Sequence, residues 1–189
     1  MFIQTEETPN PSTLKFLPGK ILLEKGTLEF KSPEEATKNS LASMLFVDDN
    51  VKGVFIGKDF LTVTKSESVE WEILKPTLLS SILDYFSSGG EIENFESGTK
   101  SKVEEIKYTK KDQEIVNKIN ELLEERIKPA VAQDGGDINF VKLQKGIVFL
   151  ELRGACSGCP SSTITLKSGI ENMLKYYIPE IKSVEAINQ

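Results

Sequence analysis

A polar segment in the middle of the chain limits the fold to two small units. Residues 89–105 contain three glycines and several charges and show no sustained hydrophobic periodicity, which is typical of a linker. The stretches on either side of this segment are each long enough for one small domain. We therefore expect a first domain over residues 1–88, a flexible linker over 89–110 and a second domain over 111–189.

The charges divide unevenly between the two halves. Residues 1–109 carry 12 basic and 18 acidic side chains, a net charge of −6, whereas residues 110–189 carry 11 of each. This acidity argues against nucleic acid or an anionic membrane surface as a partner.

No apolar run approaches the ~20 residues of a membrane span, and the first residues resemble neither a secretory leader nor a transit peptide. We expect a cytoplasmic protein, or a mitochondrial matrix protein if the chain is a processed organellar form.

The first half has the turn signals and apolar spacing of an α+β domain. Two strands are predicted over residues 13–17 and 27–30, followed by a hairpin over 51–56 and 60–64. The capping-box pattern Ser-x-x-Glu from Ser32 predicts a helix that runs to about Phe46. A second helix is expected to begin after Pro76 or to kink there, and to end before Gly89. Its apolar face is formed by Trp71, Leu74, Leu78, Ile82 and Phe86.

The second half predicts the order helix, strand, strand, helix, strand. The first helix should end near Pro129, and a turn with positive-φ glycines, rather than a carboxylate metal site, is expected over residues 134–137. A hairpin over 138–143 and 147–152 follows, and a last strand over 182–187 closes the unit. The second helix should carry Leu166, Ile170, Met173 and Tyr177 on one face. Both halves are thus predicted as small two-layer α/β sandwiches, so the fold class is α+β.

The strongest chemical signal is the pair of cysteines in Cys156-Ser157-Gly158-Cys159-Pro160, between a predicted strand and a predicted helix. The chain has no other cysteine and no histidine, which excludes imidazole catalysis and histidine–metal sites. Pro160 suits the first position of a helix and so places Cys159 near the N-cap. There, free backbone amides and the positive end of the helix dipole favour a thiolate.

The number of ligands points to a dimer. Structural zinc and iron–sulfur clusters usually need four protein ligands, and one chain offers only Cys156 and Cys159. Two chains supply four thiolates around a two-fold axis. Three alternatives remain open: a thiol–disulfide redox protein that uses the same pair, a zinc site between two chains, and inert cysteines. The redox alternative is weakened by the 30 residues that follow Cys159, too few for the rest of a thioredoxin-like fold.

Two motifs resemble one known family. Residues 133–137, Gln-Asp-Gly-Gly-Asp, followed by a hairpin and residues 154–162, Gly-Ala-Cys-Ser-Gly-Cys-Pro-Ser-Ser, resemble the C-terminal domain of NifU-like (Nfu-type) iron–sulfur proteins. The opening residues 4–16, Gln-Thr-Glu-Glu-Thr-Pro-Asn-Pro-Ser-Thr-Leu-Lys-Phe, resemble the N-terminal domain of two-domain Nfu proteins. The two motifs occur in the family's order and together span nearly the whole chain.

The resemblance implies a carrier rather than an enzyme. It implies that Cys156 and Cys159 ligate a four-iron four-sulfur cluster shared by a homodimer, although the sequence alone leaves a two-iron cluster open. The expected partners are apo iron–sulfur client proteins and an upstream cluster assembly scaffold. The first domain would recognise partners, which fits its lack of cysteine.

Overall fold

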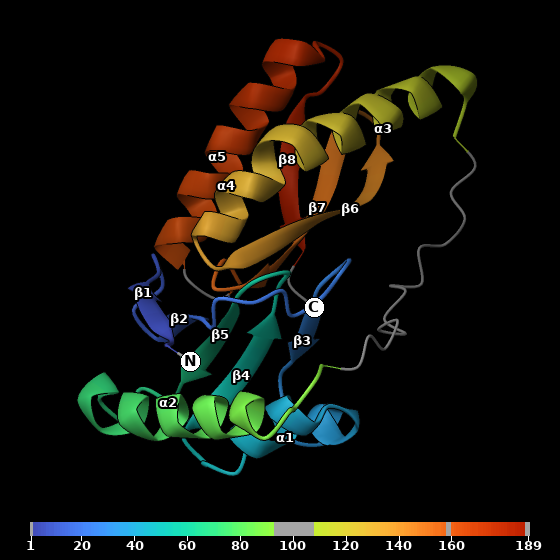
Figure 1. The fold of residues 1–189 in the computed structure, drawn as a ribbon. Coiled ribbons are helices and arrows are strands. Elements are labelled where there is room, and N and C mark those ends of the chain that lie inside the picture. The colour runs from blue at the N-terminus through green and yellow to red at the C-terminus, as the bar shows by residue number, and fades with distance from the viewer. Residues whose placement is uncertain (1, 93–107, 158–159, 188–189) are drawn as a thin grey trace. The chain divides into compact units, whose positions relative to one another are not determined.

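The computed structural model describes residues 2–92, 108–157 and 160–187, with only the backbone described for 160–162. The chain divides into two compact units, Met1–Ser97 and Gly98–Gln189, and each unit has its own hydrophobic core. Residues 93–107 of the predicted flexible linker lie outside the described residues. The α+β class predicted from the sequence is confirmed in both units (Figure 1).

The first unit is built on a five-stranded antiparallel sheet in the order β1-β2-β5-β4-β3. Its strands are β1 (Gln4–Glu7), β2 (Thr13–Leu17), β3 (Leu28–Phe30), β4 (Val51–Ile56) and β5 (Leu61–Lys65). The predicted strands and the hairpin are confirmed to within about a residue. Strand β1 was not predicted, because its residues Gln-Thr-Glu-Glu are polar and mostly exposed and so give no apolar alternation.

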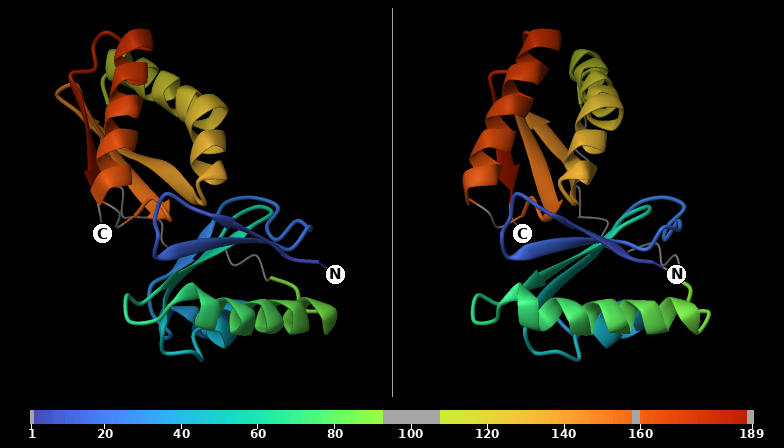
Figure 2. Two further views of the ribbon diagram at one scale, coloured as in Figure 1. Left: turned by 90° about the vertical axis from the view of Figure 1, so that its left-hand side faces the viewer. Right: turned by 60° about the vertical axis from the view of Figure 1, so that its left-hand side comes forward.

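Helices α1 (Ser40–Leu45) and α2 (Trp71–Ser87) cover one face of this sheet (Figures 1 and 2). The single helix predicted to run to Phe46 is wrong: a 3₁₀ turn, η1 (Glu35–Lys38), precedes α1. Asn39 separates the two, because its backbone is extended and its side-chain oxygen accepts a hydrogen bond from the amide of Ala42, 2.9 Å away. Helix α2 begins before Pro76 rather than after it, and buries Leu74, Leu78, Ile82 and Phe86 as predicted.

The second unit has a three-stranded sheet in the order β6-β7-β8. Strands β6 (Gly136–Gln144) and β7 (Ile147–Gly154) form the predicted hairpin, and β8 (Ser183–Ile187) pairs parallel to β7. The crossover between β7 and β8 contains α5 (Pro160–Tyr177). Along β7, Val148, Leu150 and Leu152 are buried and alternate with less buried residues, so one face of the sheet packs on the helices (Figure 2).

The first helical segment of this unit is longer than predicted. Helix α3 (Lys110–Leu122) continues through a π-helical turn, η2 (Leu123–Ile127), into α4 (Lys128–Gln133). Pro129 therefore lies in the first turn of α4, directly after the π-helical turn, instead of ending the helix. No helix among the described residues is both long and apolar enough to span a bilayer.

The buried face of α5 differs from the prediction at Leu174 and Tyr177. Ile170 is buried as expected and Leu166 and Met173 pack at the edge of the core, but Leu174 is fully buried and was not predicted. Tyr177, which was placed on the same face, is 39% exposed. The guanidinium of Arg126, in η2, lies 5.3 Å from the centre of the Tyr177 ring, so the two side chains form a cation–π contact.

Candidate functional site

The candidate site begins where β7 ends. Gly154 has a φ of 64°, a left-handed conformation that glycine adopts without steric cost. The chain then turns sharply, and the amide of Ser157 donates a hydrogen bond to the carbonyl of Gly154 at 3.0 Å. Cys156 lies inside this turn, and α5 begins at Pro160, as the sequence predicted. The thiol is therefore carried by a strand–turn–helix junction.

A second backbone segment holds this turn in place. The amide of Ala155 donates to the carbonyl of Gly135 at 3.1 Å, and Gly154 pairs with Gly136 at the open end of the hairpin. Gly135 has the positive φ expected for the turn over 134–137, a value of 81°. The cysteine turn is thus fixed to the start of β6.

Gly136 meets a different requirement from Gly135. It is not among the glycines with positive φ, but a Cβ added there would lie 2.7 Å from Sγ of Cys156 and 2.6 Å from the carbonyl oxygen of Arg153. The thiol therefore packs directly against the backbone of Gly136, and Cys156 is only 5% exposed. Gly136 was not predicted as a site residue. The sequence does contain a signal for it: the turn needs a glycine only at Gly135, where φ is positive, so a second glycine at 136 calls for another reason.

The backbone of Cys156 is also tied to α5. The hydroxyl of Thr163 donates to the carbonyl of Cys156 at 3.3 Å, across the start of the helix. On the other side, Asp137 is 9% exposed and accepts a hydrogen bond from the amide of Ile138 at 2.8 Å. Backbone hydrogen bonds thus hold the turn around Cys156 both to Gly135, just before β6, and to the first turn of α5.

The second predicted ligand, Cys159, lies outside the described residues, as does Gly158. Within the described part of the chain, no group of three or more histidine, cysteine, aspartate or glutamate residues is placed to hold a metal ion. The described part of the site therefore offers the single thiol of Cys156, and the meeting of the two thiols stays a prediction.

Both halves of the chain match known protein families. Residues 3–89 match the family described as "Scaffold protein Nfu/NifU N terminal", and residues 119–185 match the "NifU-like domain". A solution NMR structure of a NifU-like protein from Saccharomyces cerevisiae is 28% identical, with a TM-score of 0.46, and the match covers 50% of this chain and 87% of that one.

Two curated relatives match almost the whole chain. The human protein named "NFU1 iron-sulfur cluster scaffold homolog, mitochondrial" is 48% identical over 190 residues, which cover 99% of this chain and 72% of that protein. "NifU-like protein 4, mitochondrial" of Arabidopsis thaliana is 48% identical over 187 residues, which cover 98% of this chain and 65% of that protein.

The names of these relatives also bear on the expected location. Both proteins are called mitochondrial, which fits the organellar alternative, and the cytoplasmic expectation draws no support from them. The two family matches occur in the order that the sequence motifs indicated, and the relatives extend over both units. The chain belongs to the Nfu family of NifU-like scaffold proteins.

Proposed function

We propose that two copies of this chain hold one iron–sulfur cluster as cargo and deliver it to apo-proteins. The observation that carries the proposal is the fixed thiol of Cys156 in a chain with one other cysteine, Cys159, and no histidine. A cluster with four protein ligands then needs both cysteines of both chains. The name of the human relative, an iron–sulfur cluster scaffold homolog, supports the same role.

The geometry around Cys156 suits a ligand that is ready before the cargo arrives. Hydrogen bonds fix the backbone on both sides of this residue, through Ala155 to Gly135 and through Cys156 to Thr163. A ligand whose backbone is already ordered loses less conformational entropy when it binds iron, and here the thiol, which is 5% exposed, has to turn outward to reach a cluster.

Delivery follows from ligand exchange. A thiolate of the client attacks one iron, a new iron–sulfur bond forms, and the bond to one cysteine of the carrier breaks. The released cysteine leaves as a thiolate and takes a proton from solvent, so no electron is transferred. Four such steps move the cluster, and the protein acts as a carrier and not as an enzyme.

The proposed cargo is a four-iron four-sulfur cluster, and the partners are apo iron–sulfur clients downstream and an assembly scaffold upstream. The first unit would recognise these partners. The alternative of a thiol–disulfide redox protein is not favoured by family membership, since the human relative is named an iron–sulfur cluster scaffold homolog.

Anaerobic reconstitution with iron and sulfide tests the proposal. We expect a brown dimer with about two irons and two sulfides per chain, which corresponds to one four-iron cluster per dimer. Visible absorption, iron and sulfide content and the mass in solution should be measured on one sample. A colourless monomer that binds no iron but catalytically reduces a disulfide would overturn the proposal in favour of the redox alternative.

A further inference from the structure

Strand β1 forms one edge of the sheet in the first unit. In the described part of the chain it pairs only with β2, with Thr5 opposite Phe16 and Glu7 opposite Leu14. In an antiparallel pair every second residue turns its N–H and C=O groups away from the neighbouring strand. These groups on β1 can therefore pair with another extended chain.

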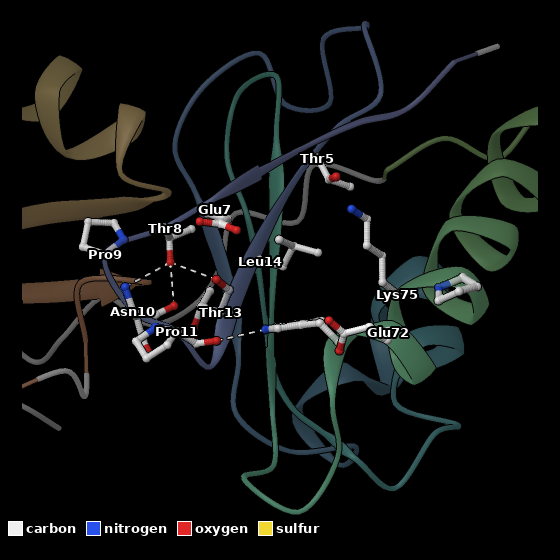
Figure 3. A pocket seen from close by; sticks show the side chains of 12 residues that line it. Thr5, Glu7, Thr8, Pro9, Asn10, Pro11, Thr13, Leu14, Glu72 and Lys75 are labelled. Atoms are coloured by element: carbon white, nitrogen blue, oxygen red, sulfur yellow. Dashed lines mark hydrogen bonds between the residues drawn. The ribbon is translucent and has the colours of Figure 1, made fainter.

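A groove lies between this edge and α2. It has a volume of about 780 Å³ and takes its lining from β1, from the turn after it and from the first turns of α2 (Figure 3). Thr5 and Glu7 are two residues apart on β1, so their side chains lie on one face of the sheet, and both line the groove. Glu72 and Lys75 line it from α2. An added strand at β1 would place every second side chain over this groove.

The groove is already formed in the free protein. The hydroxyl of Thr8 lies 2.9 Å from the carbonyl oxygens of both Asn10 and Thr13 and shares its proton between them (Figure 3). The side chain of Asn10 accepts a hydrogen bond from the amide of Ser12 at 3.0 Å. These bonds fix the turn between β1 and β2. The indole N–H of Trp71 donates to the carbonyl of Pro11 at 2.9 Å, which joins this turn to the start of α2. A preformed groove costs a ligand less ordering entropy.

The lining selects the side chain that would enter. Leu14 and Trp71 supply apolar surface, and Glu7 and Glu72 are exposed carboxylates with no ion pair among the residues that the structure describes. Lys75 adds one cation, so these three charges sum to −1. A Lys or Arg side chain fits such a lining, since its stem can lie on apolar surface while its cationic head reaches a carboxylate.

We propose that the first unit recognises partners by strand addition: an extended segment of a partner protein pairs with β1 and inserts a Lys or Arg side chain into the groove beside Glu7 and Glu72. That these partners are cluster donors or clients rests on the proposed function; the strand addition itself does not. The acidity of residues 1–109, a net charge of −6, favours the same basic segments at longer range.

A library of random decapeptides, displayed on phage and selected against the full-length apo-protein, tests the proposal. We expect the enriched peptides to carry Lys or Arg within an extended, β-prone sequence. The double variant Glu7→Gln/Glu72→Gln should bind them about tenfold more weakly, since two exposed ion pairs are lost. The control Glu24→Gln/Asp84→Asn removes two exposed carboxylates of the same unit that do not line the groove, and it should bind as the wild type does.

Hydrogen exchange then locates the bound peptide. Outward-facing amides of residues 4–7 should exchange at least tenfold more slowly when a synthetic copy of the best peptide is present. Enrichment of no peptide, equal binding to both double variants, or unchanged exchange in β1 would each overturn strand addition. The selection uses apo-protein, so its result is independent of whether the chain binds a cluster.

Discussion

Sγ of Cys156 lies against the backbone of Gly136, so close that a Cβ at this position would come within 2.7 Å of the sulfur. Gly136 is the first residue of β6, and Cys156 lies two residues after the end of β7, the strand that pairs with β6. The glycine therefore sets the position of the thiol, and the packing is independent of any cargo. This relationship makes Gly136 a positioning residue in the proposed site.

Gly136→Ala should displace the Cys156 thiol. The new methyl group also meets the carbonyl oxygen of Arg153 at 2.6 Å, so the turn has to shift away from β6. Overpacking of this kind typically costs about 1–3 kcal/mol, and we expect the Tm to fall by several degrees. Iron retained after anaerobic reconstitution should fall in parallel, measured per chain by metal analysis.

Gly169→Ala is the matched control for that variant. Gly169 lies in α5, and nothing is within 4 Å of a Cβ added there. Alanine in a helix interior is about 0.5–1 kcal/mol more favourable than glycine, so this variant should gain stability and keep its iron. Full iron binding by Gly136→Ala at wild-type stability would show that the contact does not position the thiol.

Replacement of either cysteine should abolish cluster binding. Cys156→Ser exchanges a 5% exposed thiol for a hydroxyl of similar shape, and we expect the apo fold to persist with modest destabilisation, since a buried hydroxyl needs a hydrogen-bond partner. Cys159→Ser should lose iron to the same extent. Circular dichroism of the apo-proteins checks the fold, and iron and sulfide analysis checks the ligands. Stoichiometric iron and sulfide in either purified variant would contradict the ligand assignment.

Much of the fold was predictable because its signals are local. The hairpin of the second unit is predicted by alternating apolar residues and by the turn at Lys145 and Gly146, whose φ values are 53° and 81°. The π-helical turn before Pro129 was not predictable from spacing, because tertiary packing of Ile127 and Val131 in one core overrides the local stop signal. Gly136 was missed for the same reason: its neighbour Cys156 is distant in sequence and becomes adjacent only when the hairpin forms.

Acid should weaken the attachment of β8 to α5. The pKa of Glu171 lies below its usual value of 4.5, chiefly because Lys175 donates a hydrogen bond to this carboxylate and further because the amide of Val184 donates to it at 3.0 Å. A lowered folded pKa means that the ionised form stabilises the native state above about pH 4.5. This stabilisation is lost as the pH falls through the lowered folded pKa.

The variant Glu171→Gln measures that contribution. We expect its Tm to lie below that of the wild type at pH 7, and the difference to shrink as the pH is lowered from 4.5 toward 3. Glu114→Gln, on the exposed face of α3, serves as the control. A Tm difference between the wild type and Glu171→Gln that stays constant over this pH range would refute the role of the Glu171 carboxylate.

Deletion of residues 1–88 should separate cluster binding from delivery. The second unit has its own core, with Ile119, Ile138 and Leu174 fully buried within it, so residues 89–189 should fold and hold the cluster between two copies. Transfer to an apo-client should slow, because the truncated chain lacks the acidic unit that we propose recognises partners. Salt provides an internal check: raising the ionic strength from 0.05 M to 0.5 M should slow transfer from the full-length chain more than transfer from the truncated one, since salt screens the charges of the first unit.

Equal transfer rates for the two chains at low salt would refute a role for the first unit in delivery. Loss of the cluster from the truncated chain would show that the two units are needed together to hold it.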